Sequence, residues 1–193
     1  MSQVNENVGL DGDGPATIGV RNRLPLIEDI SFNEKHYFAI IDIAKRYSEG
    51  LVGRDLSHDE LYNLGKLINA AYPYTNKVEG GGNLGLQVES SDSYNRDCQF
   101  PTAIFAATCK QIGIETRILF PSYNHDHPYV ELVTPGETLY GSFRRGEEDG
   151  ESSFFEFLDE RRKSQIETMI KNDRITVIPI SKDGFRQMDT LIS

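Results

Sequence analysis

The feature of this sequence that most limits its fold is a run, residues 98–143, that reads as one helix followed at once by strands. Residues 100–112 have helical periodicity and several small side chains, and Gly113 ends the helix. Three runs of strand character follow, over residues 115–120, 128–133 and 137–143. A Pro135-Gly136 turn joins the last two. A helix that opens directly onto antiparallel strands predicts an α+β fold.

Two helices are expected before this run. Each start has the spacing of a capping box, Ser31 with Glu34 and then Ser57 with Glu60. Residues 73–96 read as a long irregular loop. Its glycines are not followed by the Lys-Ser/Thr of a phosphate-binding loop, so we expect no nucleotide there.

One long helix and one strand are expected after the run. The helix spans about residues 152–172, with phenylalanines contributing to its apolar face. Residues 175–180 read as a strand at the edge of a sheet, because Pro179 cannot donate to a ladder. The sequence thus predicts an extended arm over residues 1–30 and one folded domain over residues 31–193.

Charge and hydropathy exclude several classes of partner. The 193 residues carry a formal net charge of −10, which argues against nucleic acid because phosphate contacts need clustered Lys and Arg. No apolar run is long enough to span a membrane, so no membrane partner is expected. Residues 1–15 lack the basic start and apolar centre of a signal peptide, so we expect a cytoplasmic location.

Cys98 is the first candidate for chemistry, because it lies at or just before the first turn of the predicted helix. The helix dipole and the unpaired N–H groups there favour a thiolate and could form an oxyanion hole. The other cysteine, Cys109, falls in the middle of the helix and reads as a core residue. About 16 Å would separate the two cysteines on one helix, so they should not form a disulfide.

His127 is the candidate base. It comes 29 positions after Cys98, at the start of a predicted strand. A Cys at a helix start followed by a His at a strand start is the order used by papain-like thiol enzymes. His127 would hold the thiolate as an ion pair and then donate its proton to the leaving group.

The same stretch resembles the transglutaminase-like superfamily. In that family a Cys opens a small-residue helix that ends in Gly-Ile, two residues and Arg, which here is Cys98 followed by Gly113-Ile114-Glu115-Thr116-Arg117. A His then heads a strand with an aromatic residue, Val and Glu, here His127-Pro128-Tyr129-Val130-Glu131. The resemblance implies a papain-like core in which Cys98 and His127 are catalytic.

The third catalytic position of the family is an Asp about fifteen residues after the His, and Ser142 stands there. If Pro135 and Gly136 are the two turn residues, the numbers of paired residues sum to 271. Ser142 then lies diagonally near His127 on one face of the sheet. Ser142 can accept a hydrogen bond from the imidazole but supplies no charge. Three acidic residues in flanking loops remain open as replacements, Asp126, Glu148 and Asp149.

Metal binding is the alternative for the same histidine. His125, Asp126 and His127 would form a zinc site only if Cys98 joined them. In the arm, Asp11 and Asp13 alternate with glycine but lack the further ligands of a calcium loop. We therefore expect no metal and no cofactor.

Two functions follow from these residues. The first is a cysteine-dependent acyl transferase or amide hydrolase that acts on a protein or peptide substrate. It would crosslink, deamidate or cleave through Cys98 and His127. The second is a catalytically inactive module of the same fold, in which Cys98 is an ordinary buried residue and residues 1–30 dock onto a larger assembly. Ser142 favours the second function.

Overall fold

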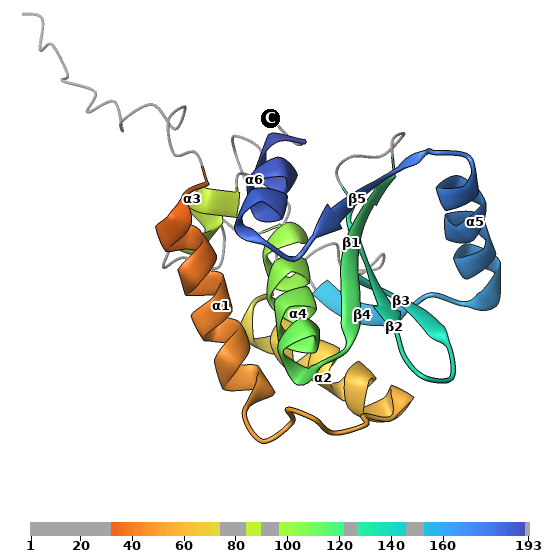
Figure 1. The fold of residues 1–193 in the computed structure, drawn as a ribbon, viewed down its shortest axis with the longest axis horizontal. Coiled ribbons are helices and arrows are strands. Elements are labelled where there is room, and N and C mark those ends of the chain that lie inside the picture. Colours follow the sequence, from red (N-terminus) through yellow and green to blue (C-terminus); the bar gives the residue numbers. More distant parts are fainter. Residues whose placement is uncertain (1–31, 74–83, 90–96, 122–126, 146–152, 192–193) are drawn as a thin grey trace, which may run out of the picture.

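The computed structural model describes residues 32–73, 84–89, 97–121, 127–145 and 153–191, shown in Figure 1. In chain order the elements are α1 (Glu34–Ser48), α2 (His58–Ala71), α3 (Leu84–Glu89), α4 (Gln99–Ile112), β1 (Glu115–Pro121), β2 (Tyr129–Val133), β3 (Thr138–Arg145), β4 (Ser153–Phe157), α5 (Glu160–Lys171), β5 (Ile175–Pro179) and α6 (Lys182–Thr190). No helix in these ranges has both the length and the apolar character needed to cross a bilayer. The predicted arm, residues 1–30, lies outside the described residues.

The five strands form one antiparallel sheet in the order β4-β3-β2-β1-β5. The expected α+β class is therefore confirmed. Val130 pairs with Gly141, and their numbers sum to 271, so the register expected from the Pro-Gly turn is confirmed as well. Strand β5 lies at an edge, where the missing N–H of Pro179 costs no ladder hydrogen bond.

Helices cover both faces of the sheet. Helix α4 packs on one face, against β1, β2 and β3, and α1 and α2 pack around it. The side chains of α4 are buried along nearly its whole length, as its many small residues allow. Helix α5 covers the opposite face, where Ile166 packs with Leu119, Tyr129 and Tyr140. In Figure 1, α4 and α5 lie on opposite sides of the strands.

The two early helices begin with capping boxes, as expected, but only one uses the expected residues. The Ser57 side chain accepts from the Glu60 N–H, and Glu60 reaches back to the Ser57 N–H. The cap of α1 is Asn33, with His36 rather than an acid at the third position. The expectation that Ser31 and Glu34 form this capping box is wrong, because the Asn33 side chain accepts from the Lys35 N–H and the His36 ring accepts from the Asn33 N–H.

The expectation that residues 73–96 are irregular throughout is also wrong. Residues 84–89 form α3, a helix of six residues. Leu84 and Gln87 of this helix are buried. A helix this short is not stable alone, so tertiary contacts must hold it. Six residues are too few for periodicity to reveal.

The long helix expected over residues 152–172 is two elements, β4 and α5. Asp159 separates them as the cap of α5, and its side chain accepts from the Arg162 N–H. Within β4 the exposure alternates: Phe155 is 2% exposed and Phe154 39%. Aromatic residues suit a pleated surface, and this preference overrode the helical spacing. Periodicity did not predict α6, whose cap is Ser181.

Candidate active site

Cys98 stands at the N-terminal end of α4, where its backbone already has helical angles of −61° and −17°. Its carbonyl accepts from the Thr102 N–H at 3.2 Å and from the Thr102 hydroxyl at 2.6 Å. The preceding residue, Asp97, accepts the Gln99 N–H at 2.8 Å. Cys98 is 5% exposed. The thiol is therefore held on a rigid turn just inside the surface.

This turn has fewer unpaired N–H groups for binding an anion than the sequence suggested. The Gln99 N–H already donates to Asp97, and Pro101 has no N–H. The start of α4 therefore presents fewer unpaired N–H donors to the thiol than a bare helix terminus would.

His127 lies two residues before the start of β2, and Ser142 lies in β3. The register brings them together, and the His127 Nε2 is 2.7 Å from the Ser142 Oγ. The Tyr129 ring packs edge-on against the imidazole, with centroids 5.2 Å apart. The imidazole is thus fixed by one hydrogen bond and one aromatic contact.

A hydroxyl this close to an imidazole also has the geometry of a serine nucleophile with its base. Ser142 could therefore act either as a nucleophile or as the residue that orients the ring. Ser142 is fully buried, at 0% exposure. A buried hydroxyl hydrogen-bonded to the ring is better placed to orient it than to attack a substrate. If Nε2 donates to Ser142, the lone pair on Nδ1 remains to accept the proton of a thiol.

The pKa of His127 is lowered to about 4, mainly by burial and also by the nearby Arg144 guanidinium, while the charge of Glu156 opposes the change. The ring is therefore neutral at pH 7. The expected resting ion pair between thiolate and imidazolium does not fit this pKa. A neutral pair fits instead, in which the ring takes the thiol proton as the thiol attacks.

Glu156 is the carboxylate of this region that the sequence did not predict. It opposes Ser142 across the β3–β4 ladder. Its oxygens accept from the two terminal nitrogens of the Arg162 guanidinium, at 2.5 and 3.0 Å, and Oε1 lies 3.1 Å from the Arg144 Nε. Two arginines thus form ion pairs with Glu156, while its charge still acts to raise the pKa of His127. The residues left open as replacements, Asp126, Glu148 and Asp149, lie outside the described residues.

Cys98 and His127 lie at the same end of the sheet. Helix α4 has 14 residues and spans about 21 Å, and β1 follows it after a tight turn at Gly113. The 7 residues of β1 return about 23 Å in the opposite direction. Because Leu119 pairs with Tyr129, the register places His127 level with the end of β1. Figure 1 shows the end of β1 and the start of α4 toward the same end of the molecule.

The two side chains reach this end from different faces. Cys98 packs in the main core with Val130. Ser142 shares the other face with Tyr140, since residues two apart in a strand point the same way. Any contact between Cys98 and His127 must pass around the end of the sheet. Within the described part of the chain, no hydrogen bond joins these two residues. Catalytic hydrogen bonds often tighten only when substrate binds.

Other residues of the family-like stretch have structural roles. Arg117 forms an ion pair with the buried Glu131, which also accepts from the Tyr140 hydroxyl at 3.3 Å. Burial and then Glu131 raise the pKa of Tyr140 to about 12. Cys109 is fully buried in the core, and burial raises its pKa. Neither cysteine forms a disulfide, as expected.

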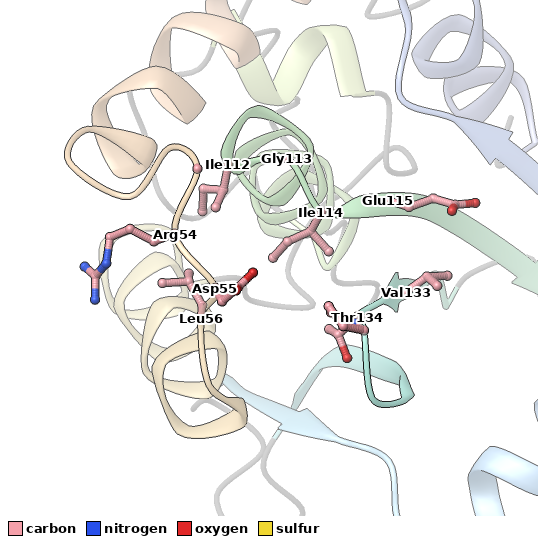
Figure 2. Close-up of a pocket in the computed structure, with 11 residues that line it drawn as sticks. Arg54, Asp55, Leu56, Ile112, Gly113, Ile114, Glu115, Val133 and Thr134 are labelled. Atoms are coloured by element: carbon pink, nitrogen blue, oxygen red, sulfur yellow. The ribbon is translucent and has the colours of Figure 1, made fainter.

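A pocket lined by described residues lies away from this site. Within the described ranges, no group of three or more His, Cys, Asp or Glu could hold a metal ion. His125 and Asp126 lie outside those ranges. Figure 2 shows a pocket of about 470 Å³ lined by residues 53–56, 112–115 and 133–135. It lies at the C-terminal end of α4, the far end from Cys98.

Comparisons with known proteins add no family to this geometry. Neither a protein-family model, nor a curated protein, nor a solved structure matches the chain. The resemblance to transglutaminase-like proteins therefore rests on the residues quoted above and on their placement in the fold.

Proposed function

We propose that this protein is a cysteine-dependent acyl transferase or amide hydrolase with a papain-like, transglutaminase-like core. Cys98 is the nucleophile, His127 the base and Ser142 the residue that orients the base. One observation carries the proposal: the Ser142 hydroxyl lies 2.7 Å from the His127 Nε2, and when Nε2 is the donor, the Nδ1 lone pair is left for a thiol at the same end of the sheet. No cofactor or metal is needed.

The chemistry follows from the neutral pair. His127 takes the Cys98 proton as the sulfur attacks an amide carbonyl. The imidazolium then gives this proton to the leaving nitrogen, and a thioester remains on Cys98. Water or an amine attacks the thioester and passes its own proton to His127, which returns it to Cys98. Water gives hydrolysis or deamidation, and an amine gives transfer.

The direct test supplies both acceptors. The protein is incubated with denatured casein and a fluorescent primary amine, and the label incorporated, the ammonia released and new peptides are measured. We expect at least one of these products from the wild type and from Cys109→Ala, and none from Cys98→Ala. Absence of all three products from the folded wild type would contradict the proposal.

A second function has its own support. Ser142 stands where the family has a carboxylate, and replacing the orienting Asp of a serine protease lowers turnover by about 10⁴. A module of this fold that has lost its chemistry would serve in binding, with residues 1–30 docking onto a larger assembly. This function predicts partners retained equally by the wild type and by Cys98→Ala.

A further inference from the structure

Helix α3 lies next to the candidate nucleophile and is held by contacts from far along the chain. It packs against α1, α4 and α6. Its six residues are too few to form a stable helix alone, so the contacts at its two ends determine whether it forms.

The first contact is the Asp189 carboxylate of α6. One of its oxygens accepts from the backbone N–H groups of Leu84 and Gly85, the first two residues of α3. The other oxygen accepts from the Phe32 N–H at 3.2 Å, just before α1. A carboxylate at a helix start satisfies unpaired donors and interacts favourably with the dipole. Asp189 of α6 therefore links the start of α3 to Phe32, which lies just before α1.

The second contact holds the last residue of α3. His36 is almost fully buried, and its Nδ1 accepts from the Asn33 N–H at 3.1 Å. The ring proton is then on Nε2, which lies 2.8 Å from a Glu89 carboxylate oxygen. The cap of α1 thus fixes the C-terminal end of α3.

Gln87 connects α3 to the nucleophile. It is 1% exposed, and its side-chain oxygen accepts from the Asp97 N–H at 3.0 Å. Asp97 in turn binds the Gln99 N–H and lies directly before Cys98. The angle at which the chain enters α4 therefore depends on where α3 holds Gln87.

We propose that Asp189 and Gln87 are positioning residues for Cys98: Asp189 sets α3, and Gln87 of α3 sets the Asp97–Cys98 turn. The inference rests on the proposed function for its purpose, but its physical content concerns only the placement of the thiol. It assigns to the last helix, α6, a role in the site that the position of α6 in the sequence does not suggest.

The test measures iodoacetamide alkylation of Cys98 at pH 5.5 and at pH 8.5 in full-length variants. The ratio of the two rates cancels changes in access, which affect both alike, and reports the thiol environment. Gln87→Met keeps the volume and removes the acceptor for Asp97, and Asp189→Asn removes the charge. We expect each to lower the ratio about three- to tenfold, the scale of one buried hydrogen bond.

Three comparisons complete the test. Asp183→Asn removes an exposed charge from the same helix and should leave the ratio unchanged. The double variant should lower the ratio no more than the stronger single one, because both act through one path. A ratio unchanged in Gln87→Met, measured on folded protein, would overturn the inference even if Asp189→Asn failed to fold.

Failure of the proposed function gives a different result. In that case the wild-type ratio is already that of an ordinary thiol and does not respond to His127→Ala. Amide exchange across residues 97–102 then decides the inference. Faster exchange in Gln87→Met than in Asp183→Asn supports it, and equal exchange contradicts it.

Discussion

At the scale of single residues, the site depends on how His127 is kept neutral and oriented. Burial lowers its pKa, the Arg144 guanidinium adds to the effect, and Ser142 supplies a hydrogen bond without a charge. A carboxylate in place of Ser142 would favour the imidazolium. Among the described residues, the Glu156 carboxylate near His127 is instead paired with two arginines. These features favour proton transfer during attack over a resting ion pair.

The titration of His127 tests this directly. Its pKa is about 4 in the folded protein, against about 6.5 when unfolded. The unfolded chain therefore binds the proton first as the pH falls. The contribution of His127 to stability is fully present above pH 6.5 and is lost as the pH falls toward 4. The loss from this group is at most about 3 kcal/mol.

The measurement is an NMR titration of the imidazole resonances, together with urea unfolding from pH 4 to 7. His127→Gln should weaken the pH dependence of stability and leave the stability at low pH closer to that at pH 7. An imidazole that titrates near pH 6.5 in the folded wild type would show that the ring is not buried as described.

At the scale of elements, the short strand β4 contributes both to the core and to the surroundings of His127. Phe155 fills the space between α2, α4 and the sheet, with its ring against Phe105 and Phe143. A methyl group on Gly65 of α2 would lie 2.2 Å from this ring, so only glycine fits there. The next strand position, Glu156, faces the site. One short strand thus joins the core to the surroundings of His127.

Two adjacent phenylalanines give a matched test of this strand. Phe155→Ala should lower the free energy of unfolding by about 3–5 kcal/mol, because it leaves a cavity in the core. Phe154→Ala, on the other face and 39% exposed, should change it by less than about 1 kcal/mol. Urea unfolding followed by circular dichroism measures both. Equal losses would be inconsistent with alternating burial.

The elements show what the sequence could predict. The Pro135-Gly136 turn was sufficient to predict the pairing register and hence the nearness of Ser142 to His127, because a hairpin is a local structure. Glu156 was missed because the aromatic run around it also fits helical spacing. Asp189 was missed because it lies 105 positions from Leu84, and no local pattern records such a contact.

At the scale of the whole molecule, two lengths match. The chain runs along α4, turns at Gly113 and runs back along β1 over nearly the same distance. The start of α4 and the end of β1 therefore lie at the same end of the sheet (Figure 1). The helices α1, α3 and α6 surround that start and hold it through Asp189 and Gln87. The fold thus brings Cys98 and His127 to the same end of the sheet from opposite faces, and the proposed function requires that they pair around that end.

Alkylation of Cys98 with iodoacetamide from pH 4 to 9, mapped by mass spectrometry, tests the pairing most directly. Cys109 is the internal control and should stay unmodified, because it is fully buried. We predict that Cys98 of the wild type reacts below pH 8.5, the ordinary pKa of a free cysteine, because the neutral His127 ring accepts the thiol proton as the sulfur attacks. In His127→Ala this reactivity should be lost below about pH 7. Cys98 titrating as an ordinary thiol in both proteins would contradict the account.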